Sequence, residues 1–133
     1  MGTPAEFGAV SVLFEDDHLI VTVKPAGLPT ANAPAGSPSL FHQLKDRLGH
    51  DAFVGVVSRL DAAVSGIVVF AKTQRSAARL CDQFRDRTVE KLYQAIVTGR
   101  FPAAIGAWLE WTDSLERPPG PKPTMIVSPA TKE

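Results

Sequence analysis

The segment SRLDAAVSG (58–66) contains the residues best suited to chemistry. Asp61 follows Arg59 by two residues, at the end of a short run that is typical of a strand. A guanidinium beside a carboxyl group favours the ionised form, and such a carboxylate can attack an electrophilic sugar carbon. A structural ion pair, or an aspartate that caps a turn, accounts for the same residues. From the residues alone this second interpretation is favoured, since polar residues are common in turns.

Other familiar kinds of site find little support. His42, Asp46 and His50 are spaced four apart, but Gly49 is expected to end the helix before His50. A polar helix face is therefore favoured over a metal site. The sequence contains neither GxGxxG nor GxxxxGK, and VSG (64–66) lacks the first glycine of a nucleophile elbow. Phosphate-cradling loops and serine hydrolysis are thus not indicated.

Length and composition are those of one globular domain. The chain has 133 residues, of which 44% are apolar and 21% are charged. No apolar run approaches the roughly 20 residues that a membrane helix needs, so we expect no membrane partner. The single cysteine, Cys81, excludes an internal disulfide, and together with the absence of a secretory signal it predicts a cytoplasmic protein.

Charge is balanced overall but unevenly distributed. Fourteen basic residues cancel fourteen acidic ones, which is not the signature of a strong nucleic-acid binder. Residues 1–51 carry three basic and six acidic side chains, whereas residues 72–91 carry six basic and three acidic ones. The middle of the chain is therefore the better candidate for contact with a polyanion, although a solvated helix face of mixed charge is the simpler interpretation.

The hydrophobic pattern predicts an α+β fold. Alternating or continuous apolar runs indicate strands, and apolar residues that recur every three or four positions indicate helices. This order of elements predicts a mixed, mostly antiparallel sheet with helices packed on it. The run at 66–72 is nearly all apolar, as expected of a strand covered on both faces. The expected strands are 10–14, 18–24, a short strand that runs into a turn within 55–61, 66–72, 92–99, 107–112 and 124–128.

Two helices have recognisable ends. Ser37 is expected to cap the first helix, with Pro38 at its first position and Gly49 just beyond its last. Thr73 is expected to cap the second helix. A long loop rich in proline and glycine, residues 24–38, precedes the first helix. The inner stripe of the second helix is expected to consist of Ala77, Leu80, Cys81 and Phe84.

Three blocks in order give the sequence a resemblance to a known family. They are VLFEDDHLIVTVKPAGLPT (12–30), SRLDAAVSGIVVFAKT (58–73) and QFRDRTVEKLYQAIVTG (83–99). The first block resembles the entry hairpin and KPxG loop of that family. The second block resembles its hallmark (H/G)RLDxxTSGLLLxAK, and the third block resembles its motif QFxxRxVxKxYxAxVxG. Together they are similar to the RluA-like branch of the RNA pseudouridine synthases.

The resemblance implies a function and a set of site residues. It implies an isomerase that converts uridine to pseudouridine in rRNA or tRNA without a cofactor. Asp61 falls on the catalytic aspartate of the family and Tyr93 on the active-site tyrosine that packs against the target base. Arg59, Lys24 and Lys91 fall on matching positions of the motifs, and we expect them to bind substrate. Four arginines are candidates for contacts with the RNA backbone, and exposure to solvent on a helix face is an equally good interpretation. They are Arg75, Arg79, Arg85 and Arg87.

The sequence departs from the family pattern within the hallmark motif. Ser58 stands where His or Gly is usual, Ala62 where the family often has a polar residue, and Val64 in place of the threonine of TSG. These changes are expected to affect RNA contacts more than the aspartate itself.

The resemblance ends before the catalytic domain of the family does. In the family a later segment resembling (L/I)xQIRxH follows, whereas this sequence ends at SPATKE (128–133). We therefore expect a single partial catalytic domain over 1–133, with a flexible N-terminus (1–9) and a proline-rich C-terminal segment (113–133). Two other hypotheses remain open: a non-catalytic RNA-binding remnant, and a fragment that forms a homodimer through an open sheet edge.

Overall fold

The computed structural model describes residues 9–34, 36–100, 104–110, 115–116 and 126–127. By the contacts between its residues the chain divides into two compact units, Met1–Leu92 and Tyr93–Glu133. Each unit is described by itself below.

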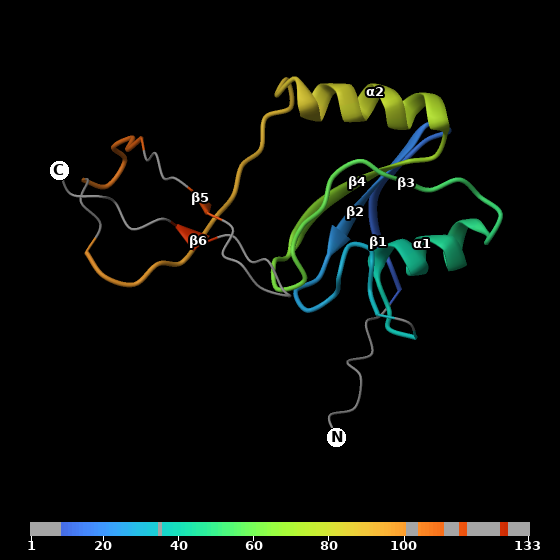
Figure 1. Cartoon of the computed structure of the whole chain (residues 1–133), viewed down its shortest axis with the longest axis horizontal. Helices are drawn as coiled ribbons and strands as arrows, with labels where there is room; N and C mark the ends of the chain where they lie inside the picture. The colour runs from blue at the N-terminus through green and yellow to red at the C-terminus, as the bar shows by residue number, and fades with distance from the viewer. Residues whose placement is uncertain (1–8, 35, 101–103, 111–114, 117–125, 128–133) are drawn as a thin grey trace. The chain divides into compact units, whose positions relative to one another are not determined.

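The first unit is an antiparallel sheet with one helix on each side (Figure 1). The strand order is β1-β2-β4-β3, so β1 is an edge strand, and pairing of this edge with a second copy stays a prediction. The predicted α+β class is confirmed. The strands are β1 (Ser11–Glu15), β2 (Leu19–Lys24), β3 (Gly55–Val56) and β4 (Gly66–Ala71), and the helices are α1 (Leu40–Leu48) and α2 (Gln74–Arg85).

The core lies between the sheet and α1. Side chains alternate along β2, so that Ile20, Thr22 and Lys24 all point into this layer and are fully buried. Thr22 satisfies its hydroxyl by donating to the Val68 carbonyl oxygen at 3.2 Å. Each large apolar side chain buried here contributes about 1.5–3 kcal/mol. The apolar core cluster is Ile20, Leu28, Leu40, Leu44, Val68 and Phe70.

The start of α1 differs from the prediction. Ser39, not Ser37, is the N-cap: its Oγ accepts the N–H of His42 at 3.2 Å, and the residue is fully buried. Pro38 precedes this cap instead of opening the helix, and Ser39 itself has the extended geometry of an N-cap, with φ −142° and ψ 161°. The predicted end is confirmed, since Gly49 has φ +102° and donates its N–H to the Lys45 carbonyl oxygen.

The start of α2 agrees with the prediction, and its inner stripe agrees in part, because Ala77, Leu80 and Phe84 are partly buried. Thr73 forms a capping box with Ser76, in which each side chain accepts a backbone N–H of the other residue. Cys81 is exposed rather than packed, and no residue of α2 is fully buried. Among the strands, the helix makes its main contacts with β3 and β4.

The face of the sheet on the α2 side is only partly covered. The prediction that both faces of β4 are covered is wrong for Ile67, which is 63% exposed, whereas Val68 and Phe70 on the α1 side are buried. Leu13 and Phe14 of β1 are also exposed. An apolar run therefore did not imply complete burial, because α2 reaches the sheet mainly near Ala71.

The second unit contains one short pair of strands, β5 (Leu115–Glu116) and β6 (Ile126–Val127), which run antiparallel. The predicted strand 92–99 is wrong, as is 107–112 in its described part, and residues 111 and 112 lie outside the described residues. The predicted strand 124–128 is present at 126–127, and its other residues lie outside the described ones. Trp108 is 98% exposed.

The short strand predicted to run into a turn within 55–61 is present as Gly55–Val56, which pairs with β4. The remaining residues form a loop, which places Asp61 beyond the sheet and not at a strand end. Across the described parts of the chain, we find no helix whose length and apolar character would let it cross a bilayer.

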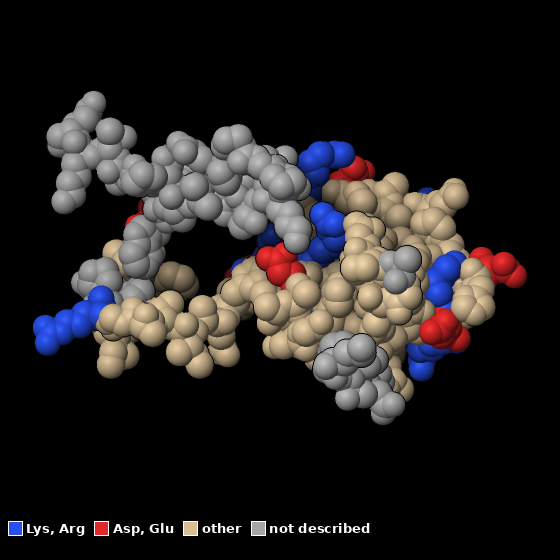
Figure 2. All heavy atoms as spheres, turned by 60° about the horizontal axis from the view of Figure 1, so that its bottom comes forward, with Lys and Arg blue, Asp and Glu red and all other residues tan. Residues whose placement is uncertain are grey.

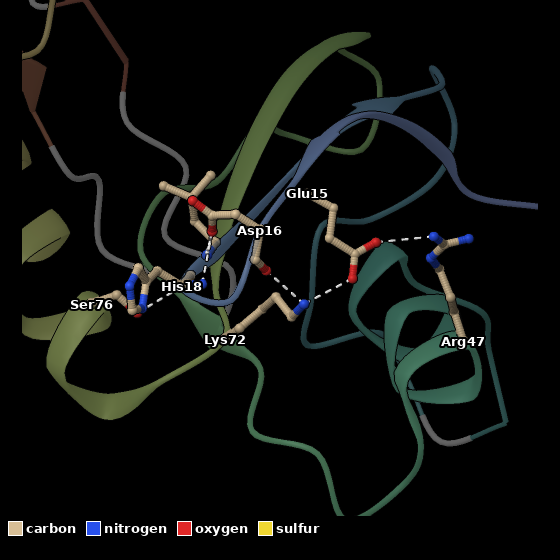
Figure 3. A network of polar contacts seen from close by, with 7 residues as sticks. Glu15, Asp16, His18, Arg47, Lys72 and Ser76 are labelled. Carbon is tan, nitrogen blue, oxygen red and sulfur yellow. Dashed lines mark hydrogen bonds and ion pairs between the residues drawn. The ribbon is translucent and has the colours of Figure 1, made fainter.

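A polar network ties the β1–β2 turn to both helices (Figure 3). Glu15 accepts from Lys72 Nζ at 2.9 Å and from Arg47 at 3.0 Å, and these contacts, led by Lys72, lower the pKa of its carboxyl group. Asp16 accepts the backbone N–H groups of Leu19 and His18, which lower the pKa of its carboxyl group. Figure 2 shows acidic and basic side chains side by side at one edge of this unit.

The contribution of Glu15 to stability is expected to disappear in acid. Because its pKa is lower in the folded than in the unfolded state, its contribution is present above the unfolded value near 4.5 and is lost as the pH falls through the folded value. Glu15→Gln should lower the free energy of unfolding by about 1 kcal/mol at pH 7 and by almost nothing at pH 3. Urea denaturation at both pH values measures this difference.

Asp46→Asn is the matched control, because Asp46 contacts only the exposed His50, at 3.8 Å. It should change the free energy of unfolding by less than about 0.5 kcal/mol at pH 7. An equal loss for Glu15→Gln at pH 7 and pH 3 would show that its ion pairs contribute nothing.

Candidate active site

Asp61 lies in the loop between β3 and β4, where the chain turns before entering β4. The N–H of Val64 donates to the Asp61 carbonyl oxygen at 3.0 Å and closes this turn. Gly66 then starts β4 with φ +152°, and a Cβ there would lie 3.2 Å from Leu60 Cδ1. The backbone angle therefore favours glycine at this point, and a Cβ would also require a small shift of the Leu60 side chain.

Lys24 holds this loop from inside the protein. Its side chain is fully buried, and Nζ donates to the carbonyl oxygens of Leu28 at 2.6 Å and of Pro25 and Ala62 at 3.0 Å. Burial lowers the pKa of Lys24, and the negative charge of Asp61 opposes this shift. The N–H of Gly27 also donates to the Ala62 carbonyl oxygen, at 2.7 Å. The loop that follows β2 is thus fixed to the residue after Asp61.

Thr30 fixes the residue before Asp61. Its Oγ1 donates to the Leu60 carbonyl oxygen at 2.8 Å and accepts the Leu60 N–H at 3.1 Å, and Thr30 is almost fully buried. Sequence reasoning did not single out this threonine. The only available signal was its position as the last residue of the block VLFEDDHLIVTVKPAGLPT (12–30).

A solvent-open cavity of about 470 Å³ lies beside Leu60 and Ala62, the two residues that Thr30 and Lys24 hold in place. Asp61 and Arg59 are both exposed and both contribute to its wall. They form no ion pair with each other, so the partnership expected from their spacing is absent from this structure. The negative charge of Asp61 acts instead on the buried Lys24, where it opposes the lowering of the pKa by burial. The lining residues are Pro29, Thr30, Ala31, Arg59, Leu60, Asp61 and Ala62.

The other residues expected at the site lie elsewhere in the chain. Lys91 is exposed in the segment that follows α2 and does not line the cavity. Tyr93 belongs to the second unit and is 65% exposed there. Its pairing with Asp61 stays a prediction.

The polar face predicted for α1 agrees with the structure. His42 Nδ1 contacts Ser39 Oγ at 3.0 Å, and His50 and Asp46 form an exposed pair. Within the described ranges, no three residues of the metal-binding types are grouped closely enough to hold a metal ion.

Comparison with known proteins identifies the family. The profile of the RNA pseudouridylate synthase family matches residues 18–127. The chain belongs to this family. The match includes the loop after β2, the Asp61 loop and the segment that contains Lys91 and Tyr93.

Among curated members of the RNA pseudouridylate synthase family, several are similar over the same region. The dual-specificity RNA pseudouridine synthase RluA of Vibrio vulnificus is 37% identical over 97 residues, which are 71% of this chain and 38% of that protein. The ribosomal large subunit pseudouridine synthase D of Xanthomonas campestris is 42% identical over 68% of this chain and 28% of its own length. The mitochondrial tRNA pseudouridine(32) synthase of Saccharomyces cerevisiae is 36% identical over 74% of this chain and 21% of its own length.

The chain therefore spans less than half the length of these family members. Among solved structures, human RNA pseudouridylate synthase domain containing 4 is 29% identical, with a TM-score of 0.48 over 59% of this chain and 30% of that one.

Removal of the buried ammonium group of Lys24 is expected to destabilise the first unit strongly. Lys24→Met keeps much of the side-chain volume but removes the ammonium donor from three carbonyl oxygens, of which that of Ala62 keeps the Gly27 N–H. The free energy of unfolding should fall by about 2–4 kcal/mol, as measured by urea denaturation at pH 7.

Lys45→Met provides the comparison, because Lys45 Nζ donates to one carbonyl oxygen, that of Ala52 at 2.6 Å. Its cost should stay below about 1.5 kcal/mol. If both variants lose the same stability, the three contacts of Lys24 do not act as the anchor of the Asp61 loop.

Proposed function

We propose that this chain carries out RNA pseudouridine synthesis, isomerising uridine in rRNA or tRNA with Asp61 as the catalytic residue. The observation that supports this most directly is the position of Asp61. Its side chain is exposed in an open cavity, while the residues on either side are held by Thr30 and Lys24. A reactive group needs this combination of access and fixed geometry. Membership of the family supplies the reaction.

The reaction exchanges one bond for another within the same nucleotide. The bond between N1 of uracil and C1′ of the ribose breaks, and a bond between C5 and C1′ forms. The C5 proton is lost and N1 gains a proton, so nothing is oxidised or consumed. The Asp61 carboxylate acts either by adding to C1′ or by removing a proton from the ribose, and either route needs it within reach of the sugar.

The remaining site residues have separate roles in this proposal. Tyr93 provides an aromatic surface on which the detached uracil can turn, and its phenol assists the loss of the C5 proton. Arg59 and Lys91 contact the RNA as cations and offset the few kcal/mol needed to extrude the target base.

We assign Lys24 a positioning role in place of the substrate contact expected from its motif. An ammonium group has three N–H donors, and three backbone carbonyl oxygens accept them. No donor is left for RNA.

The relatives support RNA as the partner. They include enzymes of the large ribosomal subunit, of tRNA and of dual specificity. The proposed partner is therefore rRNA or tRNA, and the cytoplasmic location expected from the sequence remains part of the proposal.

Loss of the Asp61 carboxylate is expected to abolish the reaction. Asp61→Asn keeps the shape of the side chain but removes the nucleophile or base, so release of tritium from RNA containing 5-tritiated uridine should fall at least about 100-fold. Asp51→Asn is the control, because Asp51 is also exposed but does not line the cavity. Full activity of Asp61→Asn would remove this residue from the mechanism. RNA binding without tritium release by the wild type would favour the non-catalytic remnant.

Two substitutions of Tyr93 are expected to separate its stacking role from its acid–base role. Tyr93→Phe keeps the ring and loses the hydroxyl, whereas Tyr93→Ala loses both. If the ring is the platform and the phenol assists proton loss, Tyr93→Phe should lower kcat with little change in KM, and Tyr93→Ala should also weaken RNA binding, by about 1–3 kcal/mol. Wild-type kinetics for Tyr93→Ala would refute the assignment.

A further inference from the structure

A second groove lies over the first half of α2, in the unit that also contains Asp61. Its volume is about 570 Å³, and every residue that lines it belongs to the first unit. The start of β2 forms one wall and α2 the other. A hydrogen bond from Ser76 Oγ to the His18 carbonyl oxygen, at 2.7 Å, holds the walls together. The groove is lined chiefly by His18, Leu19, Arg75, Arg79, Leu80 and Gln83.

This groove is separate from the Asp61 cavity. The two share no lining residue. Strand β4 leaves the Asp61 loop at Gly66 and ends at Ala71, just before the Thr73 cap of α2. Six residues of strand span about 20 Å. The two sites therefore lie near opposite ends of β4.

The groove carries positive charge that no carboxylate in the described structure neutralises. Arg75 and Arg79 line it without forming an ion pair, and no acidic residue is part of its wall. The nearby Asp16 directs its carboxyl oxygen to backbone N–H groups of the turn. Arg47 and Arg85, by contrast, are paired with carboxylates. Only two of the four arginines at 75–87 are therefore both unpaired and gathered in a groove.

The arrangement of the two arginines fits a phosphodiester chain. Residues four apart on a helix are neighbours on one face, with Cβ atoms about 5–6 Å apart. Two guanidinium groups at this spacing can each bind one of two successive phosphates, and the planar fork of arginine suits bidentate contact with phosphate oxygens. Leu19 and Leu80 supply an apolar floor for the sugars and bases between them.

We propose that this groove is a second RNA-binding site, in which Arg75 and Arg79 bind backbone phosphates of an RNA segment remote from the target uridine. The inference rests on the proposed function for its choice of ligand and adds a site that the Asp61 cavity does not include. It also separates the arginines of this region: Arg75 and Arg79 contact RNA, and Arg85 does not.

The test measures binding of the full chain to two fluorescent RNAs, one of about 20 nucleotides and one of about three centred on the same uridine, by anisotropy over a range of salt concentrations. The double variant Arg75→Gln/Arg79→Gln should bind the long RNA about tenfold more weakly, and its salt slope should fall by about 1.4. Affinity for the short RNA should not change, because a short strand that occupies the Asp61 cavity cannot reach about 20 Å away.

Two control variants accompany the double variant. Arg85→Gln removes one arginine charge from the same helix, but at a residue that is already paired with Asp82 and Asp86. It should change the affinity by less than about twofold. Arg75→Lys/Arg79→Lys keeps the charges and should keep most of the salt slope. Circular dichroism and urea denaturation of each variant check that the fold is retained.

The outcomes separate this inference from the proposed function. Unchanged affinity of the Gln double variant for the long RNA, with tritium release intact in the wild type, would overturn the groove alone and would favour a protein ligand for it. An equal effect of Arg85→Gln would overturn it too, since the effect would then reflect net charge only. If the wild type neither binds RNA nor releases tritium, both proposals fail. Weaker binding confined to the long RNA and to the Gln double variant supports the groove whether or not the chain is catalytically active.

Discussion

The ammonium group of Lys24 is the constraint on which the candidate site depends. A charge buried in a small unit is costly unless polar groups surround it, and here three carbonyl oxygens do so. Two of these oxygens belong to the loop after β2 and the third to the loop that bears Asp61. The same contacts that satisfy the buried charge therefore join two segments 38 residues apart. Asp61 itself faces solvent, while buried side chains hold the backbone of the residues on either side of it.

The parts of the fold that local patterns determine could be predicted from the sequence. Alternation and β-branched residues placed the first two strands to within a residue or so, and Thr73 and Gly49 marked helix ends where φ angles and capping bonds confirm them. The apolar run at 66–72 was correctly assigned to a strand, but the run could not reveal that Ile67 is left exposed. Burial depends on which element lies above a residue, and that is not a local property.

The family resemblance points to the residues of the candidate site, but their contacts could not be predicted from the sequence. Asp61 and Lys24 were identified through the family resemblance, whereas the spacing of Arg59 and Asp61 suggested an ion pair that is absent. Thr30 was missed because its two hydrogen bonds join residues 30 apart in sequence. The strands expected at 92–99 and in the described part of 107–112 do not form, for a related reason. β propensity describes residues that suit a sheet, but a strand forms only where a pairing partner is present.

The residues on either side of Asp61 are held through main-chain atoms. These are the carbonyl oxygens of residues 60 and 62 and the N–H of residue 60. Every amino acid supplies the same carbonyl group, so the side chain at position 62 is free to drift during evolution without loosening the loop. Alanine at this position is compatible with that anchoring. Side chains around Asp61 can therefore change while the placement of Asp61 itself stays the same.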